Sequence, residues 1–306
     1  MADRPAPATR RRRSAGAVHI GISGWRYARW RRVFYPKGLA QSRELAYASR
    51  TFSSIEINGT FYRLQRPEFF EAWAAETPDD FVFALKGSRF ITHMKRLKDP
   101  DPALARFFAS GPLQLGEKLG PIVWQLPPAF KFDASRLEAF FATLPRDTHA
   151  ALALAARAPA VRGQRFRTPR QVPLRALRHA LEIRHDSFRT PEFVRLLRAH
   201  DIALCCADTV EWPRLMDVTA DFIYCRLHGS KVLYASGYGE KALRTWARRV
   251  VAWARGGEPD DAERATDQPA PRRRTRDVYV YFDNDAKVRA PVDARRLAEL
   301  VRAELG

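Results

Sequence analysis

The stretch Phe222-Ile223-Tyr224-Cys225-Arg226-Leu227-His228 decides the fold class of this chain. It is an apolar run of strand length, yet ionisable residues stand at its end. Successive side chains of a strand point to opposite faces, so Arg226 and His228 share one face, and Cys225 and Leu227 share the other. A charge turned toward a covering helix would be buried without a partner, at a penalty of several kcal/mol. We therefore expect Arg226 and His228 to point into the interior of a closed barrel.

Seven more apolar runs of similar length occur along the chain, and helix-like stretches separate them. The eight runs are Val18–Ser23, Ser54–Asn58, Phe81–Lys86, Ile122–Leu126, Ala180–Arg184, Ile202–Ala207, Phe222–His228 and Val278–Asn284. This alternation predicts an α/β fold of the TIM (β/α)8 barrel type. We expect an insertion before the fifth strand, between Pro145 and Arg178. We also expect a flexible loop, Arg255–Arg276, before the eighth strand, because that stretch is rich in Gly, Pro and charge.

Polar, ionisable or aromatic residues stand at or just after the ends of these runs. They are Trp25, Glu56, Asn58, Lys86, Gln125, Glu182, Arg184, His185, Asp208, Arg226, His228, Asn284 and Asp285. Glu56 and Asn58 share one strand face, as do Glu182 and Arg184. The C-terminal ends of the strands carry the chemistry of TIM barrels, so these residues predict an active site at that rim. The alternative is an internal salt-bridge network of Glu56, Glu182, Arg184 and Arg226 that only fills the barrel.

Length and composition fit one globular domain. The chain has 306 residues, 46% of them hydrophobic, and we expect a single barrel domain over residues 17–306. Three cysteines without a zinc-ligand spacing exclude a disulfide framework and indicate a reducing compartment. No stretch has the length of a membrane span, and the N-terminus lacks the apolar segment of a signal peptide. We therefore expect a cytoplasmic protein without membrane contacts.

The charge of the chain is strongly positive, at +19. Part of this excess lies in Arg10–Arg13 and Arg272–Arg274. Residues 1–16 contain Pro, Ala and Arg without a periodic apolar face, which predicts a disordered basic tail. Such a run is either a solvated tail or an arm that binds nucleic acid weakly and without sequence preference.

Short motifs in one order along the chain resemble a known family. They are Ile20–Trp25 (IGISGW), Phe34–Pro36 (FYP), Ile55–Tyr62 (IEINGTFY), Ile91–His93 (ITH), Trp124–Pro128 (WQLPP), Leu181–His185 (LEIRH), Tyr224–Gly229 (YCRLHG) and Tyr279–Asp285 (YVYFDND). They are similar to the signatures of the YecE-like family, domain of unknown function 72, from about Val18 to about Val301. The resemblance implies a TIM barrel and names no reaction. Asp283 stands where many relatives have Asn, and the segments around 150–178 and 255–276 depart from the family core.

The residue types at the rim favour an enzyme that performs acid/base chemistry on a small anionic or phosphorylated substrate. Lys86, Arg184 and Arg226 are cations suited to bind a carboxylate or a phosphate. The other roles that we assign are Glu56 or Glu182 as the base, His228 as the acid or electrophile, Asn58, Gln125 and Asn284 as orienting groups, and Trp25 and Asp285 as further substrate contacts. The loop Gly229–Gly239 leads to a helix N-terminus, a common phosphate position in barrels, or is a mobile lid without a ligand.

Two other functions fit parts of the sequence. Glu56, Glu182, Asp208 and His228 would be the ligands of a divalent-metal-dependent phosphoesterase or nuclease. The +19 charge is instead typical of a non-catalytic nucleic-acid-binding protein. The leading hypothesis includes no metal. Hydrolase, isomerase and lyase reactions, the cofactor and the oligomeric state are all left open.

Overall fold

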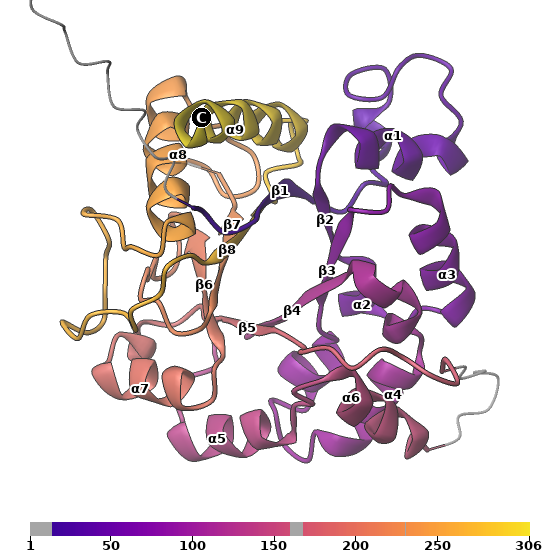
Figure 1. The fold of residues 1–306 in the computed structure, drawn as a ribbon, viewed down its shortest axis with the longest axis vertical. Coiled ribbons are helices and arrows are strands. Elements are labelled where there is room, and N and C mark those ends of the chain that lie inside the picture. The colour runs from indigo at the N-terminus through magenta and orange to yellow at the C-terminus, as the bar shows by residue number, and fades with distance from the viewer. Residues whose placement is uncertain (1–13, 160–167, 230) are drawn as a thin grey trace, which may run out of the picture.

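A computed structural model describes residues 14–159, 168–229 and 231–306. Eight parallel strands follow one another around a closed barrel in chain order, as Figure 1 shows. The strands are β1 (Val18–Ser23), β2 (Ser54–Ile57), β3 (Val82–Lys86), β4 (Leu119–Gln125), β5 (His179–Glu182), β6 (Ala203–Asp208), β7 (Phe222–Leu227) and β8 (Asp277–Phe282). The predicted TIM barrel is thereby confirmed.

Helices surround the barrel after seven of the eight strands. They are α1 (Glu44–Thr51) after β1, α2 (Gly59–Tyr62) and α3 (Pro67–Glu76) after β2, α4 (Asp101–Ala109) after β3, α5 (Ala134–Thr143) and α6 (Thr148–Ala156) after β4, α7 (Pro191–Ala199) after β5, α8 (Glu240–Ala254) after β7 and α9 (Ala290–Leu305) after β8. In the part of the chain that the structure describes, β6 and β7 are joined without a helix.

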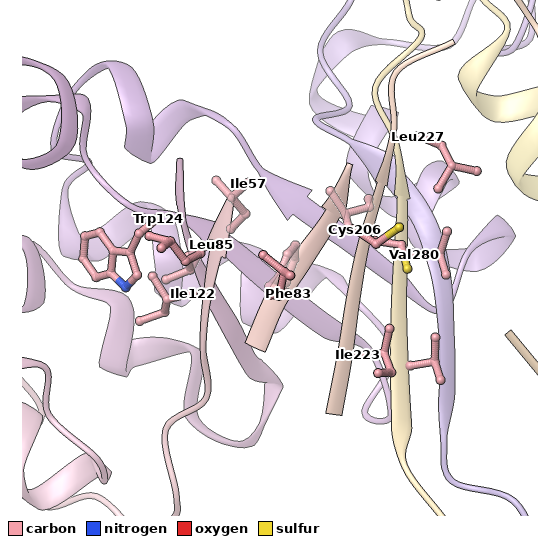
Figure 2. Close-up of a cluster of buried hydrophobic side chains, with 14 of the residues drawn as sticks. Ile57, Phe83, Leu85, Ile122, Trp124, Cys206, Ile223, Leu227 and Val280 are labelled. Atoms are coloured by element: carbon pink, nitrogen blue, oxygen red, sulfur yellow. The ribbon is translucent and has the colours of Figure 1, made fainter. Parts of the chain in front are cut away.

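Alternation along the strands separates two cores. The outward residues pack against the helices, and Figure 2 labels several of them, among them Leu85 of β3, Cys206 of β6 and Val280 of β8. The inward residues form a separate cluster that includes Tyr224 and Tyr281. These side chains fill the N-terminal part of the barrel interior, so a ligand could enter only at the C-terminal mouth.

The predicted insertion before β5 contains α6, which packs beside α4. Asp147 caps the N-terminus of this helix, because its side chain accepts a hydrogen bond from the Ala150 backbone N–H at 2.7 Å. Residues 160–167 of this insertion lie outside the described residues. The remainder returns to β5 without regular structure.

The predicted loop 255–276 before β8 lacks helix and strand, but specific contacts hold it to the barrel. The Asp217 carboxylate accepts hydrogen bonds from the backbone N–H groups of Ala265 and Thr266 at 2.8 and 3.2 Å. The Arg249 guanidinium pairs with Asp261 at 2.8 Å. The loop thus lies against the β6–β7 connection, where the helix layer is interrupted. We therefore expect less mobility at these contacts than composition alone indicates.

The predicted basic tail covers residues 1–16, and residues 1–13 of it lie outside the described residues. The Gly16 backbone N–H donates to the Ala254 carbonyl at 2.9 Å, so the described chain is attached to α8 from this point. No helix among residues 14–159, 168–229 and 231–306 is long and apolar enough to cross a membrane. The single domain over residues 17–306 stays a prediction.

Candidate active site

Arg226 lies at the centre of the C-terminal mouth and joins three carboxylates. Its guanidinium donates to Glu182 at 2.7 Å, to Asp283 at 2.8 Å and to Glu56 at 2.9 Å. Arg226, Glu56 and Glu182 are fully buried. They come from β7, β2 and β5, so barrel closure alone brings them together. The guanidinium fork satisfies carboxylates in several directions, which a lysine ammonium could not do at this position.

Arg184 provides a second cation beside Glu182. Its Nε donates to Glu182 Oε1 at 2.7 Å, and its Nη2 donates to Gln125 Oε1 at 2.8 Å. The guanidinium lies 4.1 Å from the centroid of the Trp212 ring. Burial opposes ionisation of Glu182, but the charges of Arg184 and Arg226 override it and hold the pKa of Glu182 well below its usual range. Glu182 is therefore ionised at neutral pH and paired with both guanidiniums.

Glu56 is held from three sides. The Tyr224 hydroxyl donates to Glu56 Oε2 at 2.6 Å, and the Ser23 hydroxyl donates to Glu56 Oε1. Asn58 donates to the same Ser23 oxygen at 3.0 Å, while the Asn58 Oδ1 atom is buried without a hydrogen-bond partner among the described residues. Both oxygens of the Glu56 carboxylate thus accept hydrogen bonds from protein side chains. The Asn58 Oδ1 atom remains able to accept a hydrogen bond.

Lys86 differs from the two arginines because its ammonium has no hydrogen bond or ion pair within the described part of the chain. The Nζ atom lies 4.3 Å from the centroid of the Phe61 ring. Only 6% of the residue is exposed. Burial and, to a lesser degree, the charge of Arg226 lower the pKa of Lys86 to about 8. A buried amine in this state can give up or take a proton near neutral pH.

His228 is fully buried beside the carboxylate of Asp283. Its Nδ1 lies 3.3 Å from Asp283 Oδ2, a contact longer than an ordinary hydrogen bond, and its Nε2 has no hydrogen-bond partner among the described residues. Burial lowers the pKa of His228. Burial opposes ionisation of Asp283, but Arg226 and His228 hold its pKa at about 2. A neutral imidazole therefore faces an ionised carboxylate.

The electrostatic effects of Lys86 and Arg184 converge on His93. This residue follows β3, and its Nδ1 lies 2.9 Å from the Thr92 hydroxyl. Burial and, to a lesser degree, the charges of Arg184 and Lys86 lower the pKa of His93 to about 4. The half-buried space beside His93 is therefore positive and favours an anion.

Asp208 and Asn284 have the wrong strand phase for the mouth. Asp208 follows Cys206 on the outer face of β6, where it accepts hydrogen bonds from Trp246 at 3.2 Å and Arg214 at 3.0 Å. Asn284 continues the outer face of β8 and donates to Asp293 of α9 at 2.8 Å. Both side chains hold helices or loops against the barrel, so neither joins the carboxylates around Arg226.

Three other predicted residues lie at the edge of the mouth. Trp25 packs edge-on against Trp73, with the ring centroids 5.3 Å apart. Asp285 is partly buried, and burial together with the charge of Asp283 raises its pKa to about 6. His185 accepts a hydrogen bond from the Ser187 backbone N–H at 3.1 Å and so caps a short turn.

Four residues near the mouth were not predicted from the sequence. Asp283 and Ser23 had a detectable signal, because each continues the inward alternation of its strand, as Tyr279 and Tyr281 show for β8. Trp212 and Tyr234 come from the connections after β6 and β7, where no periodic pattern places a side chain. The Tyr234 hydroxyl lies 3.3 Å from Arg184 Nη2, and its backbone adopts φ of 58°.

The predicted metal ligands are not assembled. Arg226 occupies the space between Glu56 and Glu182, and Asp208 points away from both. In the described ranges no group of three or more His, Cys, Asp or Glu side chains could hold a metal ion. A guanidinium that neutralises the carboxylates competes with any cation for the same oxygens.

Comparisons with known proteins agree with this barrel. The family model "Protein of unknown function DUF72" matches residues 19–305. The UPF0759 protein YecE of Escherichia coli K12 is 31% identical over 113 residues, which are 37% of this chain and 39% of YecE. The UPF0759 protein YunF of Bacillus subtilis is 29% identical over 118 residues, which are 37% of this chain and 41% of YunF. The chain thus spans about two fifths of the length of these curated relatives.

Two solved structures cover nearly the whole chain. A DUF72 family protein of Thermotoga maritima has a TM-score of 0.69 and 25% identity, over 94% of this chain and 99% of that protein. A DUF72 family protein of Enterococcus faecalis has a TM-score of 0.64 and 14% identity, over 93% and 95%, and shows likeness of fold alone. On the match over residues 19–305, the chain belongs to the DUF72 family of proteins of unknown function.

Proposed function

We propose that the mouth of this barrel binds a small anion, either a phosphate monoester or a carboxylate, and performs proton transfer on it. The single observation that carries this proposal is Lys86, a buried ammonium without a carboxylate partner in the described chain. A buried cation without a partner is destabilising, so a site that keeps one is suited to receive an anion from outside. The charges of Arg184 and Lys86, which act on His93 in addition to burial, support the same polarity of the space beside it.

The roles of the side chains follow from their pairing. Lys86 and His228 exchange protons with the ligand, because neither is consumed by a strong hydrogen bond. Arg184 binds the anion from one side, while its hydrogen bonds to Glu182 and Gln125 fix its position. Glu56 and Glu182 hold Arg226 rather than act as bases. This assignment keeps His228 in the acid/base chemistry and places Lys86 in the role predicted from the sequence for Glu56 or Glu182.

The experiment is a ligand screen with matched variants. Phosphorylated and carboxylated metabolites are scanned for a rise in melting temperature, and compounds that stabilise the protein are incubated with it and followed by NMR for conversion. A ligand present at about 100 times its dissociation constant adds about 2.7 kcal/mol of stability, which such a scan detects. We expect Lys86→Met and Arg184→Met to lose the stabilisation and His228→Asn to lose conversion. Equal stabilisation of the wild type and Lys86→Met would refute the proposal.

A further inference from the structure

Two neighbouring cavities open on the side of the mouth formed by the connections after β1, β2 and β3. One has a volume of about 340 Å³ and includes Tyr62, Phe90 and Met94 in its lining. The other has a volume of about 380 Å³ and includes Trp25, Tyr27 and Trp73. Tyr62 and Arg63 line both cavities. The two cavities therefore form one groove with Tyr62 between its halves, and we call it the Tyr62 groove.

Exposed apolar side chains distinguish this groove from an ordinary surface. Tyr62 is 63% exposed, Met94 67% and Phe90 43%. Scattered exposed apolar residues are common, but a contiguous group in a concave surface marks a binding site. The exposed Tyr62 ring is in edge-to-face contact with Phe61, at 5.1 Å between ring centroids.

The groove is also positive throughout. Arg26, Arg63, Arg89 and Arg106 line its two halves, and neither lining contains an Asp or Glu. Three further cavities of the described chain each include at least one aspartate. None of the four arginines forms an ion pair within residues 14–159, 168–229 and 231–306, and the buried Arg106 Nε has no hydrogen-bond partner there. The Arg89 guanidinium lies over the Tyr62 ring, 5.8 Å from its centroid, so a base that enters the groove would meet the tyrosine and the arginine together.

We propose that the Tyr62 groove binds single-stranded nucleic acid. Aromatic faces for unstacked bases, combined with cations for the phosphates, are the two parts of a sequence-independent single-strand site. Two cavities on either side of one tyrosine suit successive bases splayed from a strand, whereas a duplex keeps its bases stacked and cannot fill them. The proposal is independent of the proton transfer at Lys86 and His228, because neither residue lines the groove.

The test is fluorescence anisotropy with a labelled ten-nucleotide oligo(dT), a duplex of equal length as competitor, and thymidine monophosphate as a second competitor. Tyr62→Leu should weaken binding of the single strand roughly tenfold or more, while Tyr62→Phe should bind as the wild type does. The triple variant Arg26→Ala, Arg63→Ala, Arg89→Ala should reduce the slope of log affinity against log salt by about 2.

The charge-matched control removes three exposed arginines elsewhere, Arg272→Ala, Arg273→Ala and Arg274→Ala. This control should keep most of the affinity, and melting temperatures of all variants should stay near the wild-type value because the altered side chains are exposed. The proposal is overturned if the control loses as much affinity as the groove triple variant, if Tyr62→Leu binds unchanged, or if the duplex competes equally. Competition by the free mononucleotide at the same concentration as the strand would reassign the groove to single nucleotides.

Discussion

Arg226 Nη1 and Glu182 Oε2 lie 2.7 Å apart with both side chains fully buried. Arg226 also contacts Glu56 and Asp283, so one guanidinium neutralises three carboxylates from three strands. The pair therefore fixes the positions of the strand ends around the mouth. Because Arg226 takes up these carboxylates, Lys86 has no ion-pair partner within the described chain.

Arg226→Met should be strongly destabilising, because it leaves Glu56, Glu182 and Asp283 buried without their common partner. We expect a loss of about 3–5 kcal/mol in the free energy of unfolding. Urea denaturation measures it. The control Arg248→Met, at an exposed position of α8, should change stability by less than about 0.5 kcal/mol. A similar small change for both variants would show that Arg226 does not organise the mouth.

Lys86→Met should be more stable than the wild type at neutral pH, and the difference should shrink as pH rises. The folded-state pKa of Lys86 is lowered to about 8, so between that value and about 10.4 the unfolded chain binds the extra proton. Wild-type stability therefore rises with pH in this window relative to the variant, by up to about 3 kcal/mol. Urea denaturation of both proteins at pH 7 and pH 10 gives the difference. A constant gap at the two pH values contradicts the burial of an unpaired ammonium.

Asn284→Ala should lower the stability of the fold without changing ligand binding. The Asn284 amide attaches α9 through Asp293, so its loss should cost about 1–3 kcal/mol of stability. Thermal melting provides the measurement, and binding of inorganic phosphate in the same samples should be unchanged. A selective loss of phosphate binding with normal stability would return Asn284 to the site.

Much of the fold could be predicted because βα alternation and strand phase are local properties of the sequence. The same phase placed Glu56, Glu182 and Arg226 on inward faces. At the end of β8 the inward series of Tyr279 and Tyr281 continues with Asp283, so the predicted Asn284 falls on the outer face.

Other parts depend on contacts that no local pattern encodes. Trp212 reaches Arg184 from a connection without helix or strand, at 4.1 Å from its ring centroid. The pairing of carboxylates with Arg226 likewise depends on barrel closure. For this reason the sequence alone predicts Glu56 or Glu182 as a base without showing that both carboxylates pair with Arg226.

Phosphate binding at Arg184 should change the fluorescence of Trp212, because the guanidinium stacks on this ring. Titration of the wild type with inorganic phosphate should give a saturable change in tryptophan fluorescence. The Trp212→Phe variant, which retains the other tryptophans, should lose most of this change. Potassium chloride at matched ionic strength serves as the control for screening. An identical change in Trp212→Phe would place the anion elsewhere.

The most direct measurement of the central claim is the pKa of the Lys86 amine, followed by NMR of protein labelled at lysine Cε. In the free protein the Lys86 signal should titrate near pH 8, well below the exposed lysines. With saturating inorganic phosphate its pKa should rise, since an anion beside the ammonium favours the charged form. A Lys86 signal that titrates together with the exposed lysines and does not respond to phosphate would contradict an anion site at the mouth.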